Sequence, residues 1–116
     1  GEIESANRAF YEGLYSRGPA QIDGYGGDPR ENEGILSLIL CDFTLDRDIR
    51  LLHKDHVQRL SQKLFRFLNA SLDDQFRKKL EETSPGFGVA DLIKATWNSV
   101  EKVKLIIATN GDYRAR

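Results

Sequence analysis

The sequence has very little cysteine, no methionine and no long apolar segment. Cys41 is the only cysteine, which excludes a disulfide within the chain and a cysteine-based zinc site. A single cysteine also fits a reducing cytosol, so a cytoplasmic protein is expected. No stretch is long and apolar enough to form a signal peptide or a membrane span. We therefore expect no membrane partner.

The chain is long enough for one compact domain and too short for two, so a single domain over residues 1–116 is expected. Charged residues make up 30% of it and the formal net charge is −1, so the overall charge predicts no particular partner. Because the chain starts at Gly1 and contains no methionine, we expect a domain of a longer protein. The remainder of that parent chain is then an expected partner.

Hydrophobic periodicity predicts an α/β fold in the order helix, strand, strand, three helices, strand. The apolar residues Ile3, Ala6, Phe10 and Leu14 recur at helical spacing, which predicts a first helix that ends near Tyr15. Gly18 and Pro19 are expected to terminate it. This helix is predicted to lie on one face of a central sheet.

Three segments are predicted to form a mixed sheet, which the helices flank. They are Gln21–Tyr25, Gly34–Thr44 and Val103–Thr109. The second is apolar on both faces apart from Ser37, as a central strand would be. The third is predicted to run parallel to the second, because a long helical connection joins them.

The connection between these strands is predicted to contain three amphipathic helices. The first begins near Asp55, the second covers Asp73–Glu82, and the third carries a stripe from Val89 to Val100. Phe65, Phe67 and Trp97 are expected in the core rather than as surfaces for base stacking.

Basic residues are concentrated in this connection. Residues up to Asp46 include three basic and nine acidic side chains, whereas residues 47–79 include nine basic and four acidic ones. Arg59, Lys63 and Arg66 form a stripe on the predicted outer face of the first connecting helix. The stripe is either an ordinary solvated face or a contact for the phosphates of DNA or RNA.

Two aspartates are candidate metal ligands. Asp23 lies in a glycine-rich segment and Asp42 lies at the end of the apolar strand. A hairpin could bring their carboxylates together, and two such oxygen ligands suit Mg²⁺, which keeps waters and phosphate in its other positions. Alternatively, Asp23 is a turn former and Asp42 caps the next turn.

Three further residues are weaker candidates. His53 and His56 could both touch one metal, but without a third histidine or cysteine nearby a surface position is favoured. Cys41 alternates onto the face opposite Asp42, so we expect a small core residue.

The segments "RGPAQIDGYGGD", "LSLILCDF" and "KLIIATNGDYRA" together resemble the restriction-endonuclease-like fold of Mrr-type domains. They are still more similar to the N-terminal domain of the abortive-infection phage-resistance (AIPR) family, over nearly the whole chain. The resemblance implies a phage-defence domain with a PD-(D/E)XK nuclease-like core, in which Asp23 and Asp42 are catalytic and bind Mg²⁺.

The chain departs from this pattern at Thr44, where the nuclease motif has a lysine. A threonine supplies no positive charge to the phosphate, and the next basic residues are Arg47 and Arg50. The resemblance therefore implies a nucleic-acid-binding domain or a weak metal-dependent phosphodiesterase. The alternative is a non-catalytic interaction domain within a multidomain protein.

Three other positions are candidates for the site. Some relatives add a glutamate from the first helix, which would be Glu12, but the helical wheel predicts that it faces water. Asn110 and Tyr113 follow the last strand and are candidates for contact with phosphate or base, with a turn role as the alternative.

Overall fold

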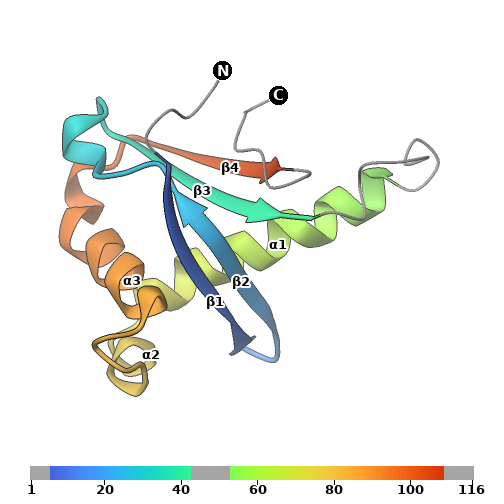
Figure 1. Cartoon of the computed structure of the whole chain (residues 1–116), viewed down its shortest axis with the longest axis horizontal. Coiled ribbons are helices and arrows are strands. Elements are labelled where there is room, and N and C mark those ends of the chain that lie inside the picture. Colours follow the sequence, from blue (N-terminus) through green and yellow to red (C-terminus); the bar gives the residue numbers. More distant parts are fainter. Residues whose placement is uncertain (1–5, 43–52, 109–116) are drawn as a thin grey trace.

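The computed structural model describes residues 6–42 and 53–108, and these residues form one α/β unit with a four-stranded mixed sheet (Figure 1). The elements follow in this order: β1 (Asn7–Tyr15), β2 (Gly18–Tyr25), η1 (Pro29–Glu31), β3 (Ile35–Cys41), α1 (His53–Ser71), α2 (Asp74–Lys79), α3 (Pro85–Thr96), η3 (Trp97–Ser99) and β4 (Lys102–Ala108).

The predicted first helix is wrong, because residues from Asn7 onward form β1. This strand pairs with β2 through a two-residue turn at Ser16 and Arg17. Its buried positions follow the period of two that is typical of a strand. Two of the apolar residues that suggested a helix are exposed instead, Phe10 by 55% and Leu14 by 76%. Pairing with β2 therefore outweighs the helical spacing, and Gly18 and Pro19 begin a strand rather than end a helix.

The three predicted strands are confirmed as β2, β3 and β4 within the described residues. The sheet order is β1-β2-β3-β4, with antiparallel β1–β2 and β2–β3 pairs and a parallel β3–β4 pair. Thr44 and Thr109, at the ends of two predicted segments, lie outside the described residues. The parallel pair follows from the helical connection, as expected.

The helices lie on one face of the sheet and bury most of the core against it (Figure 1). α1 contributes Leu60, Leu64, Phe67 and Leu68, and α3 contributes Val89 and Ile93. The three predicted connecting helices are thus confirmed, although α2 ends at Lys79 and Leu80 caps it. None of the helices in the described ranges combines the length and apolar character needed to cross a bilayer.

A second, smaller cluster lies on the other face of the sheet. It consists of Ile39, Ile106 and Ala108, with Ala6 and Cys41 packed against them. Leu38 and Leu40 alternate with Ile39 and belong to the main core, which is why β3 is apolar on both faces. Cys41 is accordingly a small packing residue, as predicted.

The sheet opens between β2 and β3. Cα register between them is limited to Gly24 with Ile39 and Tyr25 with Leu38, whereas β3 and β4 are in register from Ile35 to Cys41. On the N-terminal side of Gly24 the two strands diverge, so that β2 turns away below β3 (Figure 1). A backbone amide of β3 in this opening needs a partner other than the backbone of β2.

Candidate functional site

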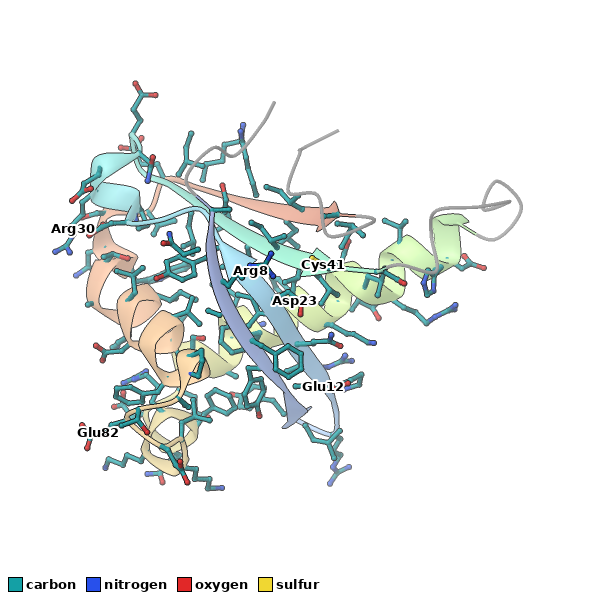
Figure 2. The ribbon with its side chains drawn as sticks, viewed as in Figure 1. Arg8, Glu12, Asp23, Arg30, Cys41 and Glu82 are labelled. Atoms are coloured by element: carbon teal, nitrogen blue, oxygen red, sulfur yellow. The ribbon has the colours of Figure 1, made fainter. Side chains whose placement is uncertain are left out.

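Asp23 provides that partner. Gly18, Ala20, Ile22 and Gly24 are the buried positions of β2, and Asp23 alternates with them, half-buried. Its Oδ2 accepts a hydrogen bond from the backbone N–H of Cys41 at 2.8 Å. Figure 2 shows Asp23 and Cys41 together at the opening between the two strands. The carboxylate therefore bridges β2 and β3 where the backbone ladder has ended.

The surroundings of Asp23 oppose its negative charge. Burial raises the pKa of its carboxyl group, the Cys41 N–H lowers it by a smaller amount, and the charge of Glu12 raises it further. Glu12 is exposed, as expected. However, it lies on a strand, in register with Gln21, and not on a helix. The strand pairing places this second acid near enough to act on Asp23.

Asp42 follows β3 directly and is held from two sides. Its backbone N–H donates to the carbonyl of Ala108 at 2.8 Å, which continues the β3–β4 pairing by one residue. Its side chain is only 11% exposed, and its Oδ2 contacts Nε2 of His56 in the first turns of α1. The start of α1 is therefore joined to the end of β3 through this pair.

The structure thus brings the Asp23 carboxylate to the amide of the residue before Asp42 and gives each carboxylate its own contact. Asp23 reaches the amide of the residue before Asp42, while Asp42 reaches α1. Among residues 6–42 and 53–108, no three histidine, cysteine or acidic side chains are grouped to hold a metal ion. Two carboxylates alone would leave most positions of a cation to water and phosphate.

His56 was predicted to be an ordinary surface residue, and sequence reasoning missed its contact with Asp42. The sequence shows only that His56 lies near the start of a helix and that this helix follows a strand ending in an aspartate. That position does not specify which side chain His56 contacts. The side chain of His53 lies outside the described part of the structure, as do Thr44, Arg47, Arg50, Asn110 and Tyr113.

The predicted basic stripe lies along α1. Arg59 is exposed, and Lys63 and Arg66 are half-buried. Nη1 of Arg66 donates to the carbonyl of Pro19 at 3.2 Å, and a side chain at Gly18 would collide with the Arg66 guanidinium. Arg66 therefore also fastens α1 to the start of β2.

The aromatic predictions have a divided outcome. Phe67 is fully buried and Trp97 packs against the core, as expected. Phe65 was also expected in the core, and this is wrong, because the ring is 54% exposed. Leu64 and Phe67 occupy the inward face of α1, which leaves Phe65 between them in sequence but on the outer side.

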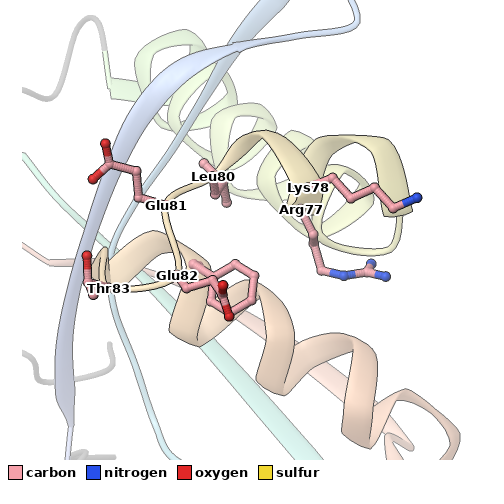
Figure 3. Close-up of a pocket in the computed structure, with 7 residues that line it drawn as sticks. Arg77, Lys78, Leu80, Glu81, Glu82 and Thr83 are labelled. Carbon is pink, nitrogen blue, oxygen red and sulfur yellow. The ribbon is translucent and has the colours of Figure 1, made fainter.

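A hollow of about 640 Å³ lies between α2 and the start of α3 (Figure 3). Arg77 and Lys78 are on one side of it and Glu81 and Glu82 on the other. Arg77 is already bonded to Asp74 and to the carbonyl of Ser71. Mixed charges of this kind favour neither a phosphate nor a metal ion, so the hollow is not a candidate site.

Replacing Asp23 with asparagine is expected to raise the melting temperature at pH 7. The amide oxygen can still accept from the Cys41 N–H, and the cost of a partly buried charge near Glu12 disappears. Because the pKa of Asp23 is raised in the folded state, the fold favours the protonated carboxyl group. The stability that this gives is complete below the ordinary aspartate pKa and is lost as the pH rises through the folded-state pKa. The gain from Asp23→Asn should therefore shrink as the pH is lowered toward about 3.

Thermal unfolding followed by circular dichroism would measure this difference. Asp91→Asn, at an exposed position on α3, is the matched control and should have little effect. A lower melting temperature for Asp23→Asn at pH 7 would mean that the charge stabilises the fold, contrary to this prediction.

Comparison with known proteins gives one match. No curated protein and no solved structure matches the chain, so the restriction-endonuclease-like fold stays a prediction. The family described as "Abortive infection phage resistance protein N-terminal domain" matches residues 1–116. The resemblance seen in the sequence is thereby confirmed at the level of this family. Since the match covers the whole chain, the protein belongs to the abortive infection phage resistance N-terminal domain family.

Proposed function

We propose that this phage-defence domain binds nucleic acid and a divalent cation, with Asp23 and Asp42 as the cation ligands. The observation that carries the proposal is the hydrogen bond from the Cys41 amide to Asp23. It fixes one carboxylate beside the strand end that bears the other. Membership of the family indicates the role in phage defence, and the proposal adds a chemical basis for it.

The electrostatics of Asp23 support a cation. A half-buried carboxylate whose pKa is raised by burial and by Glu12 costs stability in its charged form. A bound divalent ion would offset that cost, and carboxylate oxygens are the ligands that Mg²⁺ takes from proteins. Such an ion, when bound, supplies Lewis-acid stabilisation of a phosphate oxygen.

The stripe on α1 supports a nucleic-acid ligand. His56 contacts Asp42, and Arg59, Lys63 and Arg66 follow it at intervals of three or four residues along the same helix. A phosphate backbone beside this stripe would lead toward Asp42, which follows the end of β3 and contacts His56. The expected activity is weak phosphodiester cleavage, since Thr44 replaces the lysine of the nuclease pattern.

Titration calorimetry with MnCl₂ tests the cation site. Wild type should bind Mn²⁺, and Asp23→Asn or Asp42→Asn should lower the affinity at least about tenfold, because each removes a charged oxygen ligand. Asp91→Asn is the control on the exposed face of α3 and should bind like wild type. No binding by wild type at millimolar Mn²⁺, or equal binding by all variants, would refute the site.

The second candidate function is a non-catalytic interaction domain. It is favoured by the missing lysine at position 44 and by the contact between Asp42 and His56, which already occupies one carboxylate oxygen. In that case Asp23 and Asp42 hold β2, β3 and α1 together, and the Mn²⁺ titration separates the two functions.

A further inference from the structure

Phe65 is an exposed aromatic residue on the helix that also carries the basic stripe. The ring is 54% exposed, although the neighbouring residues Leu64 and Phe67 are fully buried. An exposed phenylalanine costs solvation free energy and contributes nothing to the core from this position. Its place beside cationic side chains therefore invites a functional explanation.

A hollow of about 440 Å³ borders this ring, between the β1–β2 turn and the outer face of α1. We call it the Phe65 hollow, and its lining residues are Tyr15, Ser16, Gln62, Phe65, Arg66 and Asn69. The four helical residues are spaced i, i+3, i+4 and i+7, so they share one side of α1. The volume falls in the range of about 300–1,000 Å³ that is typical of ligand sites.

The chemistry of the lining suits a nucleobase. Phe65 offers an aromatic surface, and the side-chain amides of Gln62 and Asn69 can both donate and accept hydrogen bonds, as base edges do. Tyr15 is held in place, because its hydroxyl donates to Asp73 at 3.0 Å and its ring packs edge-on against Phe76. One wall of the hollow is therefore fixed before any ligand binds.

The charges around the hollow are complementary to phosphate. Arg66 lines it, and Lys63 and Arg59 lie about one and two turns before Arg66 on the same helix. Between Arg59 and Arg66 the helix rises by about 10 Å, so the cations of the stripe can contact more than one phosphate of a strand that runs along the helix. Arg17 adds a fourth cation at the tip of the turn.

The backbone at this turn is strained. Ser16 and Arg17 have φ angles of 52° and 68°, in the left-handed region where asparagine and glycine are favoured in two-residue hairpin turns. An arginine here costs stability that glycine would not. A strained position that displays a cation beside the Phe65 hollow is consistent with selection for binding rather than for stability.

From these observations we infer that the Phe65 hollow binds an unstacked base of single-stranded nucleic acid. The base stacks on Phe65, while Arg17, Arg59, Lys63 and Arg66 contact the phosphates. A duplex keeps its bases stacked inside, so it cannot fill the hollow in this way. The inference rests on the proposed function in that it names the form of nucleic acid that the domain takes.

Fluorescence anisotropy with fluorescein-labelled dT12, in EDTA and at low salt, tests this inference. Wild type should bind dT12 more tightly than a 12-base-pair duplex. Phe65→Ala should lower the affinity for dT12 about tenfold, because base stacking on an aromatic ring is lost, while leaving the salt dependence unchanged. Arg59→Gln with Lys63→Gln should instead reduce the slope of log K against log salt by about 0.7 for each cation.

Phe10→Ala is the matched control, since Phe10 is 55% exposed but lies on β1 away from the hollow. It should bind dT12 like wild type, and Phe65→Trp should retain binding. Arg17→Gly should raise the melting temperature and yet weaken binding. Equal effects of Phe10→Ala and Phe65→Ala, or equal affinity for dT12 and duplex, would overturn the inference.

The two proposals fail separately. If wild type binds no Mn²⁺ but Phe65→Ala loses dT12 binding, the hollow is supported and the cation site is refuted. If Mn²⁺ binding depends on Asp23 and Asp42 but Phe65→Ala leaves the affinity for dT12 unchanged, the cation site is supported and the hollow is refuted. If no dT12 binds and Phe65→Ala abolishes self-association in sedimentation, the surface is a protein contact and the inference is wrong.

Discussion

Replacing Phe67 with alanine is expected to lower the free energy of unfolding by about 3–5 kcal/mol. The ring is fully buried and lies 5.5 Å from Tyr11 and 6.3 Å from Phe76, between ring centroids. Phe76 in turn packs edge-on against Tyr11 and Tyr15. This aromatic group joins β1, α1 and α2, so a cavity at its centre loosens three elements at once.

Urea unfolding followed by circular dichroism would measure this loss. A domain of this size has a total stability on the order of 5–15 kcal/mol, so Phe67→Ala should leave it marginally folded or unfolded. Phe67→Leu fills more of the space and should cost about 1.5 kcal/mol or less. Phe65→Ala removes the same side chain from the exposed side of α1 and should change stability by only about 0.5 kcal/mol. Similar losses for both alanine variants would contradict the division of α1 into buried and exposed faces.

The sheet could be predicted from the sequence largely because β3 and β4 are short apolar runs separated by a long helical connection. Such a connection favours parallel pairing of the two strands, and the run from Ile35 to Cys41 has few polar positions, so it is easily identified as a strand. The first element could not be predicted in this way. Phe10 and Leu14 are apolar and four residues apart, yet both are exposed. Only the pairing of β1 with β2 decides which face is buried.

For the candidate site, the sequence predicted the pairing of the strands but not the side-chain contacts. A hairpin was expected to bring Asp23 and Asp42 together; β2 and β3 do pair as antiparallel neighbours, and the convergence of the two carboxylates stays a prediction. The divergence of the two strands, which leaves the Cys41 amide to Asp23, has no signature in the sequence. The contact between His56 and Asp42 joins residues fourteen positions apart in the sequence. Residue spacing alone cannot predict contacts of this kind.

Exposure of Phe65 was likewise beyond sequence reasoning. In the segment "KLFRFL", Lys63 to Leu68, aromatic and aliphatic residues occupy four of six positions, and a helix that packs on one side can bury only part of them. The orientation is decided by the contacts of Leu64 and Phe67 with the sheet. The residue that remains outside is then the one available for a ligand.

Thr44→Lys is expected to raise divalent-metal-dependent cleavage of plasmid and single-stranded DNA about a hundredfold or more. Wild type should cleave poorly, because a lysine two residues after the second acid supplies the positive charge that stabilises the phosphate in the nuclease pattern. Removing one such electrostatic group typically costs about 100- to 1,000-fold in rate. Thr44 lies outside the described residues, so this prediction rests on the motif together with the position of Asp42.

Three variants make the result specific. Thr44→Gln is similar in length to lysine but uncharged, and it should remain as slow as wild type. Asp42→Ala or Asp23→Ala in the Thr44→Lys background should abolish the gain, since in the proposed site the new cation would act only on a phosphate held by a metal ion that both carboxylates bind. Robust cleavage by wild type would show that another cation, such as Arg47 or Arg50, already replaces the lysine. No gain in Thr44→Lys despite Mn²⁺ binding at Asp23 and Asp42 would instead place the domain among non-catalytic nucleic-acid-binding proteins. In that case the two aspartates would help to bind the nucleic acid without cleaving it.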